Sequence, residues 1–521
     1  MTHLLKEFER EILTKKVFAL LLLFFTTIMF APLLYIGKFN HLAADCFWYG
    51  ANGRNVWANE RSIFAVLGAA VKNVVDFWHD WQGTYSSIFM FSLTPGLFGE
   101  QYMFIVPYMM MGMILLSTFV LLYVFFIKII GTELSNFFIF FFTASFMQIQ
   151  FLYTPNSALY WYNGAVHYVF MQGFVIMNIA ILMQYFNVIL DQRSVKEKNY
   201  QDAILLAIAS LFGLIASGAN FSSTLLNIEI FTIALLVAVY IFFKLKIKKV
   251  LYILVPYFLT LTGFLFNTFA PGNANRQVHF ERTGIFESIL TSFTYSFSQM
   301  LLWVDVFVVV CLLILIPFMI KIIYRSNFKF PFAPAIAVLS YCLYASMFTP
   351  SFYAQSFVPL SRNQNICWMF LIILLIINEF YLLGWILGKI NKNKWKWLVP
   401  SFGINKWCWF AYITVLAAIF TFSFLSLGYV EKKATFVSYA AWDVIETGVG
   451  RQYHDEYLRR LYQLKKEIPE GEDRYVYVYP YTVKPYPLYF RDATEESTRE
   501  DGMLEGIEGW YNVWAVFEIR E

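Results

Sequence analysis

Long apolar runs recur along the chain and alternate with short polar segments. A helix needs roughly 20 consecutive apolar residues to span a hydrocarbon core of about 30 Å. Runs near that length predict about eleven transmembrane helices, at residues 17–36, 103–127, 135–152, 166–186, 203–217, 222–243, 250–269, 300–320, 331–348, 366–388 and 409–428. The fifth run is short and ends at Ser217-Gly218-Ala219-Asn220, so a broken or re-entrant helix stays open there. The pattern predicts an α-helical polytopic membrane protein whose transmembrane domain covers residues 1–430.

Three polar stretches are long enough to fold outside the spans: residues 37–101, about 270–299, and 431–521. The last stretch has a helical charge pattern from Tyr453 to Lys466, followed by strand-like alternation from Tyr475 to Tyr479. A final apolar stretch runs from Trp510 to Phe517. We expect residues 431–521 to form a small extracytoplasmic α/β domain.

Composition agrees with a membrane protein and narrows the function classes. Hydrophobic residues make up 59% of the chain and charged residues only 14%, against about 25% charged residues in soluble proteins. A net charge of +4 is too small to argue for a nucleic-acid partner. The five cysteines have no CxxC or Cys/His spacing, which indicates neither a disulfide framework nor a metal site.

The positions of lysine and arginine predict the orientation, because cytoplasmic loops are enriched in both. Alternate loops are basic, and the outer loops near 153–165 and 217–222 contain neither residue. The basic segments hold Lys6, Arg10, Lys15, Lys16, Lys128, Arg193, Lys196, Lys198, Lys244, Lys246, Lys248, Lys249, Lys321, Arg325, Lys329, Lys389, Lys392, Lys394, Lys396 and Lys406. We therefore expect a cytoplasmic amino terminus and an extracytoplasmic carboxyl terminus.

Basic residues are scarce on the predicted outer side, so two of them are candidates for binding an anion. Arg276 ends the segment Ala270-Pro-Gly-Asn-Ala-Asn-Arg276, where Pro271 should end a helix and Gly272 with Asn273 permits a turn with free N–H groups. Such a turn beside an arginine suits phosphate oxygens. Arg362 begins the next outer helix and could add a second cation. Both arginines could instead pair with lipid headgroups at the interface.

The first outer loop supplies acids and aromatic rings. Asp45 lies among aromatic residues near the membrane surface, where partial desolvation would raise its pKa and suit it to act as a general base on a hydroxyl. An ordinary helix cap is the alternative. A second group is typical of a sugar site, where rings stack on the sugar and polar groups bind its hydroxyls; it comprises Asp76, His79, Asp80 and Trp81. A membrane-interface aromatic belt is equally compatible with these four residues.

Two further sets of residues are candidates. Trp161, Asn163 and His167 lie at another outer helix junction and could contact a sugar or acceptor, although a lone histidine is usually structural. Glu229, Asp305 and Glu379 fall inside or at the edge of apolar runs, where an acid is costly and therefore suggests function.

The motifs together resemble the GT-C-type glycosyltransferases, and in particular a bacterial group related to serotype-converting glucosyltransferases. The similar segments are Ala44-Asp45-Cys46-Phe47, Trp81-Gln-Gly-Thr-Tyr85, Trp161 to Tyr168, Ala270 to Arg276 and Trp510 to Ala515. Only the A-P-G-N-x-x-R turn, which is matched in full, is moderately specific. The chain departs from the group in having one acid instead of an acidic pair at Asp45, and Thr84 in place of an arginine.

The resemblance implies transfer of a sugar from a polyprenyl-phosphate donor to a cell-surface glycan or lipid-linked acceptor, at the outer face of a bacterial cell membrane. Asp45 would be the base, and Arg276, Arg362 and Asn273 would bind the donor phosphate. No cofactor is implied, and participation of a divalent metal stays open. A transporter or flippase for lipid-linked saccharides, a polysaccharide polymerase or ligase, and a structural assembly partner are the alternatives.

Overall fold

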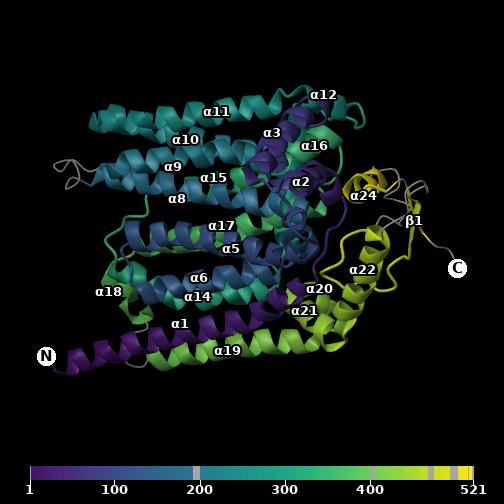
Figure 1. Ribbon diagram of the computed structural model, residues 1–521. Helices are drawn as coiled ribbons and strands as arrows, with labels where there is room; N and C mark the ends of the chain where they lie inside the picture. The colour runs from purple at the N-terminus through teal and green to yellow at the C-terminus, as the bar shows by residue number, and fades with distance from the viewer. Residues whose placement is uncertain are drawn as a thin grey trace.

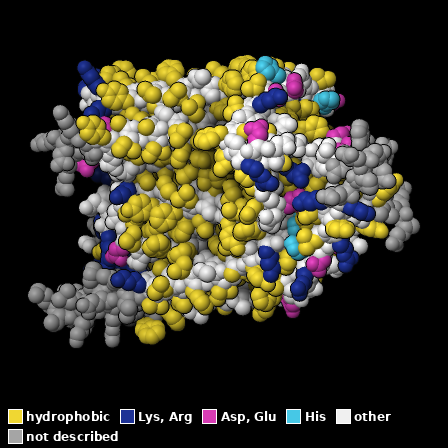
Figure 2. Space-filling model, in the orientation of Figure 1, with side chains coloured by type: hydrophobic (Ala, Val, Ile, Leu, Met, Phe, Trp, Pro, Cys, Tyr) yellow, Lys and Arg dark blue, Asp and Glu magenta, His cyan; other side chains and the backbone are white. Residues whose placement is uncertain are grey.

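A computed structural model of the chain describes residues 2–191, 200–399, 405–466, 475–492, 503–513 and 515–518. Most of these residues belong to long helices that run side by side through one bundle (Figure 1). Hydrophobic side chains form a broad band between two ends where charged side chains gather (Figure 2). Arg193, Lys196 and Lys198, which entered the orientation argument, lie outside the described residues.

Every predicted span has a helical counterpart in the bundle. Nine helices in the described part of the chain are long and apolar enough to cross a membrane, and two more are apolar but shorter. The helices that carry these spans are α1 (Thr2–Ile36), α5 (Ile105–Leu122), α6 (Leu134–Gln150), α8 (Met171–Leu190), α9 (Gln201–Ser217), α10 (Phe221–Leu245), α11 (Leu254–Thr268), α14 (Val306–Arg325), α15 (Ala333–Ser346), α17 (Ser361–Gly388) and α19 (Asn405–Ser426). The chain is thus a helical, multi-pass membrane protein.

One predicted boundary, the span at 300–320, was placed too early. Helix α13 (Ile285–Trp303) ends just before Asp305, and α14 begins just after it. The Asp305 carboxylate accepts hydrogen bonds from the backbone N–H groups of Phe307 and Val308, at 2.9 and 3.0 Å. This N-cap satisfies two donors that a helix start otherwise leaves unpaired, so Asp305 has a structural role.

Polar side chains join the helices inside the bundle. Thr118 donates to Gln148, and Gln148 donates to the backbone carbonyl of Met369, linking α5, α6 and α17. Asn178 donates to Asn227 between α8 and α10. Such bonds between membrane helices contribute roughly 0.6–2 kcal/mol each. They favour particular helix pairs, which apolar burial alone does not, because lipid tails are as apolar as the helix surfaces. They fix the order of the helices that carry the candidate residues.

The first outer region is helical, and it covers one end of the bundle (Figure 1). It contains α2 (Cys46–Glu60), α3 (Ile63–Asp80) and α4 (Tyr85–Phe91). The short helices α12 (Pro271–Gln277) and α16 (Thr349–Gln355) lie at the same end. The polar region at 270–299 is therefore also helical, in α12 and most of α13.

The described part of the tail packs on this end of the bundle as well. It contains α20 (Tyr429–Thr435), α21 (Val437–Glu446), α22 (Val449–Lys465) and α24 (Met503–Tyr511). The strands β1 (Tyr475–Val478) and β2 (Ala515–Glu518) pair in parallel. Because these two short strands are all the sheet that the described residues form, the predicted α/β domain is not shown there. Helix α24 packs along α2, so the tail and the first outer region form one surface.

Ion pairs hold the other end of the bundle together. The Glu133 carboxylate pairs with Lys15 and with Arg325, both at 3.2 Å. These pairs bring together the start of the α1 span, the start of α6 and the end of α14. The predicted cytoplasmic lysines and arginines that the structure describes at these helix ends thus lie opposite to α2 and α12. Which end faces the cytoplasm stays a prediction from the charge pattern.

Candidate functional site

Asp45 lies at the N-terminal end of α2, held by a tight turn. Ala44 adopts the left-handed backbone conformation (φ 51°), which costs a non-glycine residue about 1 kcal/mol. The following residues Cys46 and Phe47 are buried, and the Phe47 ring packs edge-on against Trp510 of the tail. The Asp45 side chain makes no cap hydrogen bond with its own helix. Its half-buried carboxylate is therefore directed at groups from other segments.

Asn163 and Trp161 approach Asp45 from the segment before α8. The Asn163 side-chain amide donates a 3.2 Å hydrogen bond to Asp45 Oδ1. Within the described residues, the buried Asn163 Oδ1 has no hydrogen-bond partner. An unpaired buried polar atom costs roughly 1–3 kcal/mol, and it is where a bound water or ligand is expected. This oxygen marks a position beside Asp45 at which a ligand could be held.

The surroundings of Asp45 alter its acidity. Burial raises the pKa of this carboxyl from its ordinary value to about 6, while the Arg362 guanidinium and the Asn163 amide oppose that rise. Desolvation disfavours the charged form, and a nearby cation favours it. The balance leaves Asp45 mostly ionised at neutral pH yet more basic than an exposed carboxylate. A group poised in this way is suited to general base catalysis.

Arg362 begins the long helix α17 and lies over two aromatic rings. Its guanidinium carbon is 5.4 Å from the centre of the Trp161 ring and 6.0 Å from that of Tyr168. It forms no hydrogen bond or ion pair with the described residues, so its five N–H donors are available. The positive end of the α17 dipole lies beside it. Both features favour an anion at this position.

Arg276 projects from α12 toward the same region and is held by Gln82. Its Nη1 donates a 2.8 Å hydrogen bond to Gln82 Oε1, while Gln82 Nε2 donates to the Tyr49 hydroxyl at 3.2 Å. Burial lowers the pKa of Arg276, and nearby Arg362 lowers it further. Tyr49 lies within electrostatic reach of Asp45, Arg276 and Arg362 together. The structure therefore gathers Asp45, Trp161, Asn163, Arg276 and Arg362, here named the Asp45 cluster.

The segment that carries Arg276 differs from the predicted turn. Pro271 does not end a helix but begins α12, for which its fixed φ is well suited. A Cβ on Gly272 would lie 2.4 Å from the backbone nitrogen of Trp81, so only glycine allows this approach. The Asn273 side chain accepts from Gly83 N and donates to the carbonyls of Asn267 and Thr268. Its amide thus braces α12 against the 81–83 segment, and the segment predicted as a turn is the start of a short helix.

The predicted sugar-binding acids lie elsewhere. Asp76, His79 and Asp80 are exposed on α3, and among the described residues their side chains form no hydrogen bond, ion pair or ring contact with the Asp45 cluster. The Asn275 side chain donates to the backbone carbonyls of His79 and Asp80, both at 3.3 Å, which ties α12 to the end of α3. Trp81 does approach the cluster, because the Arg276 guanidinium lies 5.4 Å from its ring centre.

His167 lies beside the cluster on the α8 side. Both Arg276 and Arg362 are within electrostatic reach of its ring. Its backbone carbonyl accepts a 2.7 Å hydrogen bond from Asn220, and its Nδ1 is buried without a partner among the described residues. The ring is therefore placed to contact a ligand that also touches the arginines.

Three neighbours of the cluster were not predicted from the sequence. Gln82 and Tyr49 hold Arg276, as described above. Phe490 of the tail stacks on Trp161 with ring centres 3.8 Å apart and an interplanar angle of 8°. The Asn156 side chain donates to the adjacent Tyr489 carbonyl at 3.1 Å and fixes this tail segment over the cluster. Aromatic residues are too common in this chain for Phe490 to have stood out.

Glu229 and Glu379 lie inside spans, and among the described residues neither side chain bonds to a residue of the Asp45 cluster. Ser346 donates a 2.6 Å hydrogen bond to the Glu229 carboxylate, joining α10 to α15. Glu379 Oε2 is buried without a partner among the described residues. The neighbouring Asn378 donates to the carbonyl of Leu374 in its own helix, and its Oδ1 accepts a long hydrogen bond from Ser340.

The chain matches no known protein family, no curated protein and no solved structure. Within the described residues, no group of three or more histidines, cysteines, aspartates or glutamates is arranged to hold a metal ion. The chemistry that the Asp45 cluster offers is one base of raised pKa, two guanidinium groups and stacked aromatic rings.

Proposed function

We propose that the chain is a GT-C-type membrane glycosyltransferase that moves a sugar from a polyprenyl-phosphate donor to a glycan or lipid-linked acceptor. The observation that carries the proposal is the joint placement of Asp45 and Arg362. A carboxyl with a pKa of about 6 lies within reach of a guanidinium that has no partner among the described residues. One base and a nearby anion site are what transfer from a sugar phosphate requires.

Asp45 acts as the general base of the reaction. The Asp45 carboxylate takes the proton of the acceptor hydroxyl as the acceptor oxygen forms a bond to the anomeric carbon. The bond between that carbon and the phosphate oxygen breaks, and its electron pair stays on the phosphate. The products are the glycosylated acceptor, polyprenyl phosphate and a protonated Asp45. Direct displacement without a covalent intermediate inverts the anomeric carbon.

Arg276 and Arg362 bind the donor phosphate and stabilise the charge that it gains. A guanidinium matches two phosphate oxygens at once, which a lysine cannot do. The gain of charge occurs during bond breaking, so the two arginines stabilise the transition state more than the ground state. Removing one such donor group typically costs 10²- to 10³-fold in rate.

The aromatic residues near Asp45 bind the sugar or acceptor. Trp161 stacks with Phe490 and lies beside Arg362, and Trp81 lies beside Arg276, so each arginine has an indole ring next to it. Asn163 and His167 supply the polar atoms Oδ1 and Nδ1, which are unpaired within the described residues. Hydroxyl groups of a sugar would donate to them. Asp76, His79 and Asp80 are left out of this assignment because they are exposed on α3.

The bundle holds the lipid-tailed donor at the membrane surface. The Asp45 cluster lies at the end of the spans, so a donor bound there would have its phosphate at the interface and its polyprenyl chain among apolar side chains. Under the charge-based orientation this end is extracytoplasmic and the membrane is the bacterial cell membrane. The tail from about residue 431 then covers the site from outside.

Purified protein in liposomes, given a panel of polyprenyl-phosphate sugars and glycan acceptors, tests the proposal. We expect transfer of at least one sugar, with release of polyprenyl phosphate. Arg276→Ala and Arg362→Ala should each lower the transfer rate at least 100-fold. Arg282→Ala is the matched control, because Arg282 lies against Tyr353 in the same outer region and outside the cluster. Its rate should stay within about twofold of the parent protein.

The same liposomes separate the alternatives. A transporter or flippase would move the intact donor across the bilayer without cleaving it. A polymerase or ligase would consume glycan carried on a lipid pyrophosphate and leave the monophosphate donor untouched. Either result, with no cleavage of any polyprenyl-phosphate sugar, would refute the proposal.

A further inference from the structure

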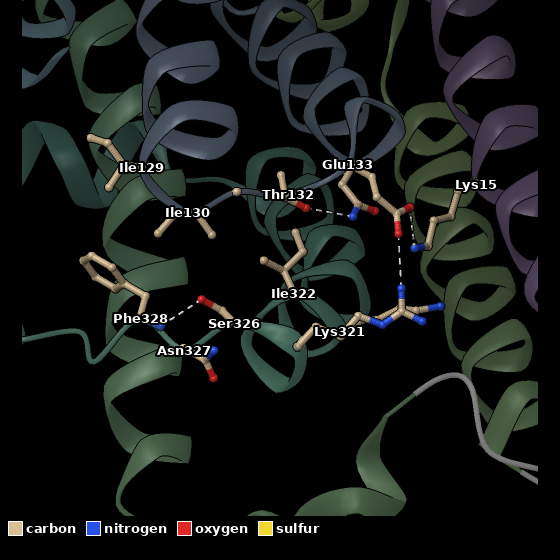
Figure 3. A pocket seen from close by; sticks show the side chains of 13 residues that line it. Lys15, Ile129, Ile130, Thr132, Glu133, Lys321, Ile322, Ser326, Asn327 and Phe328 are labelled. Atoms are coloured by element: carbon tan, nitrogen blue, oxygen red, sulfur yellow. Dashed lines mark hydrogen bonds and ion pairs between the residues drawn. The ribbon is translucent and has the colours of Figure 1, made fainter. Parts of the chain in front are cut away.

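A polar cavity lies at the end of the bundle opposite to the Asp45 cluster. It has a volume of about 420 Å³ and is lined by the start of the α1 span, the connection from α5 to α6 and the end of α14 (Figure 3). Gly131 adopts a positive φ of 77° in that connection, which turns the chain sharply around the cavity. The residues of this cavity take no part in the proposed transfer reaction.

Cationic side chains dominate the cavity. Lys15, Lys321 and Arg325 line it, and Glu133 is the one carboxylate among its described lining residues. Glu133 pairs with Lys15 and Arg325, and these pairs are drawn as dashed lines in Figure 3. Lys15 and Lys321 are each only 5% exposed. Three cationic side chains against one carboxylate give the described lining an excess of positive charge, which an anion in the cavity would balance.

The cavity also presents an unpaired acceptor. Asn136 is 4% exposed; its Nδ2 donates to Thr132 Oγ1 at 3.0 Å. Its Oδ1 is buried with no hydrogen-bond partner among the described residues. An oxygen in that state is satisfied by a donor such as a hydroxyl group. The cavity therefore offers cations for an acid group and an acceptor for a hydroxyl.

An apolar groove adjoins the cavity and shares Glu133 with it. The groove has a volume of about 580 Å³ and runs between α1 and α6. Leu20 and Leu23 of α1 line one side, and Phe138 and Phe142 of α6 line the other. A cationic cavity beside an apolar groove is complementary to an amphiphile that has an anionic head and a hydrocarbon chain.

We propose that this cavity and groove bind an anionic glycerophospholipid with a hydroxylated headgroup. Its phosphodiester lies among Lys15, Lys321 and Arg325, its headgroup hydroxyl donates to Asn136 Oδ1, and one acyl chain occupies the groove. Basic pockets between membrane helices bind anionic headgroups in this way. The site serves the leaflet at the Lys15 end, which is the cytoplasmic one under the predicted orientation. It is independent of the sugar-transfer proposal.

Native mass spectrometry of the full chain in a zwitterionic detergent tests this site, with phosphatidylglycerol and phosphatidylcholine of equal chain length as probes. We expect one phosphatidylglycerol to bind at least tenfold more tightly than phosphatidylcholine. Lys321→Gln should reduce that affinity at least tenfold. Lys248→Gln is the matched control: Lys248 is exposed outside the cavity and groove, and its loss should leave the affinity unchanged.

A groove variant keeps the test decisive if Lys321→Gln does not fold. Leu20 is 61% exposed on α1, so Leu20→Trp fills the groove without touching the ion pairs, and it should lower phosphatidylglycerol affinity at least fivefold. Water-soluble glycerol phosphate is the second probe, because it carries the phosphate and hydroxyl groups without acyl chains. Equal affinity for both phospholipids, or binding of glycerol phosphate as tight as that of phosphatidylglycerol, would overturn the proposal.

Discussion

The side-chain amide of Asn163 donates a 3.2 Å hydrogen bond to the carboxylate of Asp45, across 118 residues of sequence. The bond joins the start of α2 to the segment before α8. It orients the carboxylate and stabilises its ionised form, opposing the effect of burial. The reactivity that we assign to Asp45 depends on this balance.

The raised pKa of Asp45 predicts how the transfer rate depends on pH. Asp45 acts as a base only when it is ionised, and burial raises its pKa to about 6. The rate should therefore be level above about pH 7 and fall about tenfold for each pH unit below 6. The measurement is the initial transfer rate from pH 4.5 to 8 in liposomes. A rate that stays level down to pH 4.5 would show that Asp45 does not limit it.

Removal of the Asn163 amide should shift this profile. A hydrogen bond to an ionised group contributes roughly 1.5–3 kcal/mol, and one pKa unit corresponds to about 1.4 kcal/mol. In Asn163→Ala the ionised carboxylate loses this bond, so the pKa of Asp45 should rise by about one to two units. The acid limb of the rate profile should move upward by the same amount. Asn187→Ala is the control, since Asn187 lies near the far end of α8, bonds to Gln184 and should leave the limb in place.

Gln82 should act on the donor through Arg276. Gln82→Ala removes the 2.8 Å hydrogen bond that holds the guanidinium, and we expect a three- to tenfold rise in the donor KM. Gln82→Glu instead places a carboxylate against Arg276 and neutralises its charge toward phosphate. The second variant should therefore raise KM at least tenfold further. If both variants change kcat and leave KM unaltered, Gln82 does not act through donor binding.

Two glycines of the first outer region offer a matched test of its packing. A Cβ at Gly83 would lie 2.0 Å from the backbone oxygen of Asn267, whereas a Cβ at Gly68 meets nothing within 4 Å. Gly83→Ala should lower stability by about 1–3 kcal/mol. Gly68→Ala, within helix α3, should raise it by roughly 0.5–1 kcal/mol. Thermal midpoints of the detergent-solubilised proteins measure both, and equal midpoints would refute the close approach at Gly83.

The sequence predicted the bundle well because the length and polarity of a span are local properties. The exception was the helix before Asp305. Helix α13 buries Ser288, Ser292 and Ser296, so its mixed composition hid it inside a polar region. The strand-like residues from Tyr475 do form β1, but a two-residue alternation does not tell how many strands will join it.

Only those site residues were predictable whose charge is rare on the predicted outer side. Asp45, Arg276 and Arg362 stood out because few charged residues occur on the outer side. Gln82 did not, because its contact with Arg276 crosses 194 residues. Asp76, His79 and Asp80 share one helical face by their spacing, but the spacing does not tell whether that face meets the bundle or solvent. In the structure the three side chains are exposed on the surface of the bundle.

The most direct test of the central claim is the transfer rate of Asp45→Asn at pH 7.5, compared with that of the parent protein. Asparagine keeps the shape of the side chain and removes the base, so we predict a loss of at least 100-fold with unchanged membrane insertion. Glu60→Gln, at an exposed acid on the same helix, should retain full activity. A rate for Asp45→Asn within threefold of the parent protein would contradict the assignment of Asp45 as the base.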